Sequence, residues 1–197
     1  MFTGIIQEIG TVARIERTKG LVRLTIHAPR TASRVQRLES VAVNGTCLSV
    51  VSVRGAALIF EVIRETQTRT ALGGFRAAQR VNLEPSLAVT DRLNGHILFG
   101  HIDGVGTIIR RRQLPSELVL EIRMSRALRA FLVPKGPMAI DGVSLTAGKA
   151  LGATTCSVHL IPETLRQTTL GTRVVGDRVN LELDYLAKLV RQFLKTR

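Results

Sequence analysis

Residues 2–12 read FTGIIQEIGTV, and residues 98–108 read LFGHIDGVGTI. Gly4 and Gly10 of the first stretch recur as Gly100 and Gly106, each 96 positions later. Three more stretches recur in the same order at offsets of 97 or 98, namely 43–50 at 140–147, 63–73 at 161–171, and 80–84 at 178–182. Four matching blocks in one order indicate an internal duplication, which predicts two similar domains in tandem.

Each copy carries the signals of a small β-barrel. Asn44-Gly45 and Asp141-Gly142 lie between alternating apolar runs, which predicts two hairpins with type I′ turns. A short helical stretch that ends at glycine follows in each copy, over 65–73 and 163–171, and we expect both glycines to be left-handed. Further short helices are expected at 31–38 and 125–132. The remaining strands and turns have the spacing of small closed barrels, so the predicted fold is mainly β.

The repeat divides the chain near residues 94–97, which gives a first barrel over 1–95 and a second over 96–184. The tail at 185–197 has no counterpart in the first copy. Its apolar residues recur at intervals of three and four, which is typical of an amphipathic helix: Leu186, Leu189, Val190, Phe193 and Leu194. Such a helix either packs on its own barrels or joins copies of the chain, and the sequence leaves both open.

Composition limits the class of protein. With 197 residues and 45% hydrophobic content, the chain can bury a substantial core. Cys47 and Cys156 have no metal-ligand spacing and form no disulfide framework, so we expect no bound metal and a reducing, cytoplasmic location. The N-terminus lacks the basic and apolar regions of a signal peptide, and no stretch approaches the roughly 20 apolar residues that a membrane span needs.

The net charge of +13 allows two interpretations. One is a polyanionic partner, either nucleic acid or an acidic protein, and the other is a solvated basic surface. We favour the surface, because a barrel that binds nucleic acid needs stacking aromatic residues and only 4% of this chain is aromatic. Nucleic acid is therefore not expected, and an acidic partner from the same pathway remains a hypothesis. The run at 110–112, before Pro115, predicts an exposed turn.

Five stretches together resemble the riboflavin synthase family: MFTGIIQ (1–7), NGTCLSV (44–50), NGHILFGHIDG (94–104), KGPMAIDGVSLT (135–146) and HLIPETLRQTTLG (159–171). In this order and at these separations they cover essentially the whole chain. The resemblance implies two tandem six-stranded Greek-key β-barrels with short helices, a C-terminal amphipathic helix, and a homotrimer joined through that helix. It implies no metal and no organic cofactor.

The activity implied by the resemblance is a transferase reaction, the dismutation of two molecules of 6,7-dimethyl-8-ribityllumazine. A four-carbon unit passes from one to the other, which gives riboflavin and 5-amino-6-(D-ribitylamino)uracil. Each barrel would bind one lumazine, and the active site would form where the N-terminal barrel of one subunit meets the C-terminal barrel of its neighbour. The main alternative is a related antenna-type protein that binds a lumazine or flavin without chemistry. We favour the enzyme, because both predicted pockets are complete.

The two copies differ at positions that the resemblance assigns to chemistry. Cys47 aligns with Ser144 and Ile5 with His101, and unlike pockets suit a reaction that needs a donor and an acceptor. His101 is a candidate for proton transfer or for orienting the ring, because imidazole titrates near neutrality; otherwise it is a structural histidine. Ser144 would contact the lumazine or be a solvated hairpin serine. Cys47 would be a nucleophile or a pocket wall, and otherwise a small buried apolar group.

Four further residues match family positions at or near the site: Phe2, Lys135, Asp141 and Asp184. The three charged residues are otherwise ordinary surface charge, and Asp141 otherwise only makes its turn. Phe2 belongs to a terminal segment that folds over the pocket in this family. The junction Asn94-Gly95-His96 replaces the family's Gly-Gly-His and is not expected to affect the chemistry.

The resemblance also implies which residues contact the ligand in each of the two pockets. The first would be lined by Gly4, Ile5, Ile6, Ser40, Cys47, Leu48, Ser49, Glu61, Val62, Ile63, Arg64, Glu65 and Thr66. The second would be lined by Gly100, His101, Ile102, Lys135, Ser144, Leu145, Thr146, His159, Leu160, Ile161, Pro162, Glu163 and Thr164. Backbone beside glycine can approach a ring edge closely, and the Glu and Thr side chains suit a ribityl chain, unless they cap the helices instead. The sequence leaves open the general base, the nucleophile and the donor barrel.

Overall fold

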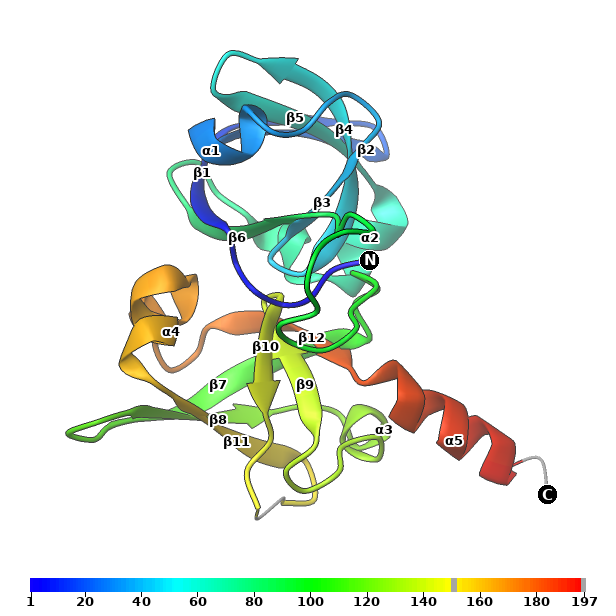
Figure 1. Ribbon diagram of the computed structural model, residues 1–197, viewed down its shortest axis with the longest axis vertical. Coiled ribbons are helices and arrows are strands. Elements are labelled where there is room, and N and C mark those ends of the chain that lie inside the picture. Colours follow the sequence, from blue (N-terminus) through cyan, green and yellow to red (C-terminus); the bar gives the residue numbers. More distant parts are fainter. Residues whose placement is uncertain (150–151, 196–197) are drawn as a thin grey trace.

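The computed structural model describes residues 1–149 and 152–195, which form two barrels, one above the other in Figure 1. The first barrel contains β1 (Glu8–Thr18), β2 (Leu21–His27), β3 (Ser40–Val43), β4 (Thr46–Arg54), β5 (Ala57–Ile63) and β6 (Arg80–Pro85). These strands pair in antiparallel fashion and close in the order β1-β2-β5-β4-β3-β6. Aliphatic side chains and Phe60 fill the interior, and Ala32 of α1 (Pro29–Ala32) packs onto this core.

The second barrel repeats this topology. It contains β7 (Gly104–Gln113), β8 (Leu118–Arg123), β9 (Pro137–Ile140), β10 (Val143–Thr146), β11 (Thr155–Leu160) and β12 (Arg178–Leu183), in the order β10-β9-β12-β7-β8-β11. The seam between β10 and β11 is joined by a bridge between Ala147 and Val158. The structure confirms the predicted mainly β fold with two six-stranded barrels, the first closed and the second nearly closed.

Both hairpin turns have the predicted conformation. Asn44 and Gly45 have φ values of 43° and 78°, and Asp141 and Gly142 have values of 47° and 79°. Two successive positive φ angles define a type I′ turn. The turns also pack against each other, because a Cβ atom built on Gly45 would lie 2.7 Å from the backbone nitrogen of Gly142. Only glycine allows the two barrels to approach this closely.

The helices are shorter than predicted. Each long helical stretch divides in two, as α2 (Arg64–Arg69) with η1 (Ala71–Gly74) and α4 (Pro162–Gln167) with η2 (Thr169–Thr172), and the earlier stretch at 125–132 contains only α3 (Arg126–Arg129). The expectation of left-handed glycines was wrong, since neither Gly73 nor Gly171 is among the described residues with positive φ. Glycine is needed there for space: a Cβ on Gly73 would lie 2.4 Å from the carbonyl oxygen of Gln67.

The C-terminal helix α5 (Tyr185–Lys195) leaves the second barrel and projects away from it (Figure 1). Asp184 precedes it, and its Oδ1 accepts a hydrogen bond from the N–H of Leu186 at 3.1 Å. The apolar residues that predicted this helix are exposed, with 59% of Val190 and 70% of Phe193 open to solvent. The helix therefore does not bury its apolar face on its own barrels.

Two further features concern the outer surface. The predicted turn at 110–112 was wrong: these arginines lie within β7, where Arg110 pairs with Glu121 and Arg112 with Val119 of β8. They are exposed strand residues of a long hairpin.

Among the helices of the described residues, none is long and apolar enough to span a membrane.

Candidate functional site

Two chain segments cross between the barrels and meet the predicted catalytic hairpins. The N-terminal segment reaches the second barrel, where the carbonyl of Gly4 accepts a hydrogen bond from the N–H of Ser144 at 2.9 Å. The segment before β7 reaches the first barrel, where the carbonyl of Gly100 accepts from the N–H of Cys47, also at 2.9 Å. These contacts differ from the predicted grouping, because Gly4 lies beside Ser144 and Gly100 lies beside Cys47.

Glycine makes both crossings possible. Gly4 has a φ of 79° and Gly100 a φ of 72°, which L side chains rarely adopt. A Cβ on Gly4 would lie 2.6 Å from Cβ of Ser144, and a Cβ on Gly100 would lie 2.6 Å from Cβ of Cys47. The crossing backbone thus lies directly on the two side chains that distinguish the copies.

In each barrel two strands separate beside this crossing. The ladder between β4 and β5 ends at Val50 and Phe60, so the strand ends beyond that pair are not hydrogen-bonded to each other. We call the following residues at these strand ends, with the crossing residue, the first half-site: Cys47, Ser49, Ile63 and Gly100. In the second barrel the bridge between Ala147 and Val158 ends the seam in the same way, and the second half-site comprises Ser144, Thr146, Ile161 and Gly4. Ile63 is 56% exposed and Ile161 61% exposed, so each half-site offers an apolar surface.

The helices that follow the half-sites do not use their Glu and Thr side chains as N-terminal caps. Within the described chain, neither α2 nor α4 begins with a side-chain cap, so Glu65, Thr66, Glu163 and Thr164 do not serve that alternative role. The carboxylate of Glu163 instead accepts from Gln167 at 2.9 Å and pairs with an exposed arginine. These hydrogen bonds lower the pKa of Glu163.

The second half-site contains a histidine that sequence reasoning missed. Nδ1 of His96 lies 2.7 Å from Oγ of Ser144. The linker therefore reaches the site through His96, whereas the departure from the family pattern lies at Asn94. His96 has no counterpart in the first copy, so the repeat gave no signal for it. The only signal was its place in the stretch that resembles the family.

Burial disfavours the charged form of His96. Desolvation lowers the pKa of its imidazole, and the nearby Asp184 carboxylate opposes this effect. The other ring nitrogen, Nε2, is buried without a partner in the described part of the chain. A neutral imidazole beside a hydroxyl can accept its proton, so the pair of His96 and Ser144 is suited to general acid–base chemistry.

The other predicted catalytic residues lie outside the pair of His96 and Ser144. Phe2 is 1% exposed and packs in a small cluster between the barrels, against which Cys47 also packs. His101 is exposed, and its ring stacks on Phe99 with centroids 6.0 Å apart. Lys135 is exposed in a turn before β9 with a φ of 63°.

Asp141 is held by structural partners. It is fully buried, its Oδ1 accepts from the N–H of Asn180 at 2.8 Å, and its Oδ2 accepts from Arg173 at 2.6 Å. Burial raises the pKa of this carboxyl, while the Arg173 charge opposes the rise. With both oxygens occupied, Asp141 can act on a ligand only through the turn that it fixes.

Several predicted ligand residues face away from the half-sites. Leu48, Val62 and Leu160 belong to the barrel cores, so only their backbone can reach a ligand. His159 contacts Glu117 at 2.9 Å and lines a separate hollow with Arg110 and other residues. Of the remaining predicted residues, Glu61 pairs with Arg23 at 2.8 Å, Ser40 pairs with Ser49 in the sheet, and Ile6 and Leu145 pack against the second core.

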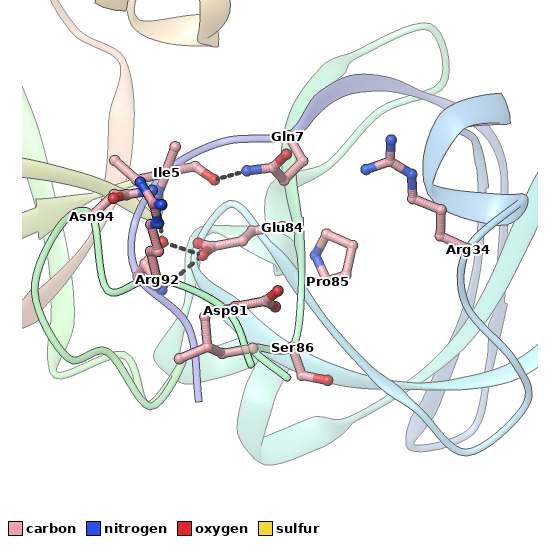
Figure 2. Close-up of a pocket in the computed structure, with 11 residues that line it drawn as sticks. Ile5, Gln7, Arg34, Glu84, Pro85, Ser86, Asp91, Arg92 and Asn94 are labelled. Atoms are coloured by element: carbon pink, nitrogen blue, oxygen red, sulfur yellow. Dashed lines mark hydrogen bonds between the residues drawn. The ribbon is translucent and has the colours of Figure 1, made fainter. Parts of the chain in front are cut away.

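A pocket of about 410 Å³ lies beside the N-terminal crossing segment (Figure 2). Its wall includes Glu84 at the end of β6, whose carboxylate accepts from the N–H of Thr3 at 2.7 Å and of Gly4 at 3.0 Å. Glu182 at the end of β12 accepts from the N–H of Phe99 at 2.7 Å and of Gly100 at 3.1 Å. Sequence reasoning missed both, although each ends a recurring RVNLE block.

Comparison with known proteins identifies the domains. A model of the lumazine binding domain matches residues 3–86 and again residues 99–184. The chain is 42% identical to the riboflavin synthase of Mycobacterium bovis, over 100% of this chain and 99% of that protein. It is 38% identical to that of Actinobacillus pleuropneumoniae and 34% identical to that of Bacillus subtilis, each over 98% of this chain and 90% of the relative.

A solved structure has the same architecture. LumP complexed with riboflavin superposes with a TM-score of 0.87 at 25% identity, covering 93% of this chain and 100% of LumP. This likeness extends over both barrels. The chain therefore belongs to the riboflavin synthase family and carries two lumazine binding domains.

Proposed function

We propose that this chain is a transferase that dismutates two molecules of 6,7-dimethyl-8-ribityllumazine into riboflavin and 5-amino-6-(D-ribitylamino)uracil. One observation carries the proposal: the two half-sites share a backbone frame but differ in chemistry, with Cys47 in one and Ser144 in the other. A dismutation needs a donor and an acceptor, and similar frames with unlike side chains fit that need. Full-length similarity to riboflavin synthases supports the same reaction.

The reaction balances without an oxidant or a reductant. The four-carbon unit that one lumazine loses is gained by the other, and the atoms of two substrates equal those of the two products. The protein must therefore hold two rings face to face, remove a proton from a methyl group and stabilise the anion. Exposed Ile63 and Ile161 supply apolar surfaces for the rings. Glu65, Thr66 and Thr164 supply polar partners for the ribityl chains.

The proton chemistry belongs to the second half-site in this proposal. Neutral His96 accepts a proton from Ser144, since Nδ1 and Oγ are 2.7 Å apart, or from a water held between this pair and the lumazine ring. Asp184, close to His96, stabilises the imidazolium that forms. Lys135 stabilises negative charge on the ring. In the first half-site Cys47 forms the pocket wall and His101 orients the second ring.

The active form is a homotrimer in this proposal, with each first half-site facing the second half-site of a neighbour. The exposed apolar face of α5 supports assembly, because contiguous exposed apolar surface marks an interaction site. Opposed half-sites from two subunits would bring two lumazines together.

The test is to mix the purified chain with 6,7-dimethyl-8-ribityllumazine, without any cofactor, and to follow riboflavin absorbance and fluorescence. We expect one riboflavin for every two lumazines consumed, and loss of turnover in Ser144→Ala. Ser157→Ala, on the outer face of β11, is the matched control and should retain activity. Tight binding of lumazine or riboflavin without turnover would instead support an antenna-type binder.

A further inference from the structure

Two buried glutamates outside the half-sites hold the crossing segments by the same device. Glu84 accepts from the N–H of Thr3 and Gly4, and Glu182 accepts from the N–H of Phe99 and Gly100, at 2.7–3.1 Å. Glu84 is 5% exposed and Glu182 3% exposed. Successive backbone N–H groups around one carboxylate form an anion nest, which a positive φ at the glycine allows. Here the bound anion is a side chain from the last strand of a barrel.

The device acts across the barrel interface. Glu84 ends the first barrel, but the segment that it holds continues to the carbonyl of Gly4, which accepts from Ser144 of the second barrel. Glu182 ends the second barrel, and its segment continues to Gly100, which accepts from Cys47 of the first barrel. Each carboxylate thus fixes a crossing residue that touches the other barrel's half-site. Figure 2 shows Glu84 reaching from β6 to the N-terminal segment.

We propose that Glu182 and Glu84 are positioning residues, Glu182 for the first half-site at Cys47 and Glu84 for the second half-site at Ser144. Their effect on catalysis rests on the proposed function, whereas the positioning itself does not. Each glutamate fixes the backbone position of a crossing segment. That backbone in turn accepts the hydrogen bond from the N–H of Cys47 or Ser144. Neither glutamate contacts the substrate in this proposal.

The electrostatics agree with this geometry. Desolvation raises the pKa of both carboxyls, and the backbone N–H groups of the crossing segments oppose the rise. Burying a carboxylate is costly without such partners, so the segment and the carboxylate depend on each other. The two nests differ in their remaining partners: the hydroxyl of Thr3 also donates to Glu84 at 2.8 Å, whereas the charge of Lys188 acts on Glu182.

The chain offers a local probe that needs no substrate. It contains two cysteines, and Cys47 lies directly beneath the crossing backbone of Gly100. Cys156 is 1% exposed, and burial raises its pKa to about 11, so it reports only on global unfolding. The experiment measures the alkylation rate of each thiol by iodoacetamide in the full-length chain, by mass spectrometry, for wild type, Glu182→Gln and Glu84→Gln. Glutamine keeps the shape but places an NH₂ group against a backbone N–H.

We expect Glu182→Gln to raise the Cys47 rate at least about tenfold, which corresponds to about 1.4 kcal/mol in local opening. Glu84→Gln should leave it within about twofold, and the Cys156 rate should not change in either variant. A reciprocal reporter, Ser144→Cys in a Cys47→Ala background, should respond to Glu84→Gln and not to Glu182→Gln. Equal Cys47 rates in wild type and Glu182→Gln would overturn the proposal, as would parallel acceleration of Cys47 and Cys156, which indicates a general loss of structure.

Turnover separates this inference from the proposed function. If the wild type converts lumazine, both variants should lower kcat by about tenfold or more while KM changes less, because the segments are misplaced rather than lost. If the wild type does not convert lumazine, the proposed function fails, and the alkylation rates still decide the positioning role.

Discussion

The side chain of Asn180 in the second barrel is hydrogen-bonded to the backbone of Asn44 in the first. Its Nδ2 donates to the carbonyl of Asn44 at 2.8 Å, and its Oδ1 accepts from the N–H of Ala71 at 2.7 Å. Asn82 makes the equivalent bonds in the opposite direction, to the carbonyl of Asp141 at 2.9 Å and from the N–H of Thr169 at 2.8 Å. Both asparagines are fully buried. The barrels are thus joined by a reciprocal polar network in addition to apolar contact.

Removing one of these side chains should destabilise the whole chain. Asn180→Ala removes the partners of the buried carbonyl of Asn44 and of the half-buried N–H of Ala71, and an orphaned buried group costs about 1–3 kcal/mol. We expect a loss of about 3 kcal/mol in the free energy of unfolding, measured by urea denaturation. Asn94→Ala, at an exposed linker position, should change it by less than about 0.5 kcal/mol. Equal effects of the two substitutions would show that the network adds no stability.

A second prediction concerns the place where the duplication is asymmetric. Asp141 and Arg173 form a buried ion pair in the second barrel, whereas the equivalent positions of the first barrel hold Asn44 and Phe75. Arg173→Phe alone leaves the Asp141 carboxylate unpaired and should cost about 3–5 kcal/mol. The double variant Asp141→Asn with Arg173→Phe recreates the first barrel's arrangement and should recover most of that loss. A double variant as unstable as Arg173→Phe in thermal unfolding would contradict this explanation.

Local signals predicted the fold well. The dipeptides at 44–45 and 141–142 predicted both type I′ turns, and the repeat predicted two barrels, because turn conformation and strand pattern depend on nearby residues. The division of α2 from η1 was missed, although it has a local cause: Thr70 is extended, and its hydroxyl caps η1 by accepting from the N–H of Leu72. The contact that could not be predicted is the one from the N–H of Ala71 to Asn180 of the other barrel, because these residues lie far apart in the sequence.

The candidate site was predictable only in part. The resemblance named Cys47 and Ser144, but similar segments at 4–6 and 100–102 could not reveal that each one covers the other barrel. Which barrel a segment reaches is decided by the path of the linker in three dimensions. The glutamates that end the RVNLE blocks did carry a signal, since a charged residue at the end of two otherwise buried strands needs a buried partner.

Acid should favour folding through Glu182. Its carboxyl has a pKa of about 6, raised mainly by desolvation from an ordinary value of 4.5 and partly restrained by the N–H of Phe99 and the charge of Lys188. Between these values the folded protein binds a proton that the unfolded chain does not, so the contribution to stability is present at low pH and is lost as pH rises through 6. The shift corresponds to about 2 kcal/mol. The unfolding free energy of wild type minus that of Glu182→Gln should fall by this amount from about pH 4 to about pH 7; a constant difference would contradict the assignment.

Assembly should depend on the exposed face of α5. Val190→Asp places a charge in the middle of this face and should prevent the proposed trimer, which light scattering coupled to size-exclusion chromatography would detect as a smaller mass. Val89→Asp is the matched control, because Val89 is exposed as well but lies in the linker before the second barrel. It should leave the mass unchanged. A trimer that survives Val190→Asp would exclude α5 as its main contact.

The fall of kcat at low pH, which we call the acid limb, should depend on the protonation of His96. Burial lowers the pKa of this imidazole, so it stays neutral and able to accept a proton from Ser144 somewhat below the ordinary imidazole value of 6.5. The wild-type kcat should therefore fall only below that value. His96→Gln preserves a polar contact with Ser144 but cannot titrate, so kcat should drop by about 100-fold or more and lose this acid limb, because general acid–base catalysis contributes about 10²–10⁴-fold. His159→Gln serves as the control, since His159 contacts Glu117 on the outer face of the second barrel, and both the rate and the acid limb should survive there. If the acid limb persists in His96→Gln and disappears in a variant of His101 instead, the proton acceptor belongs to the first half-site, and the roles assigned here to the two barrels are reversed.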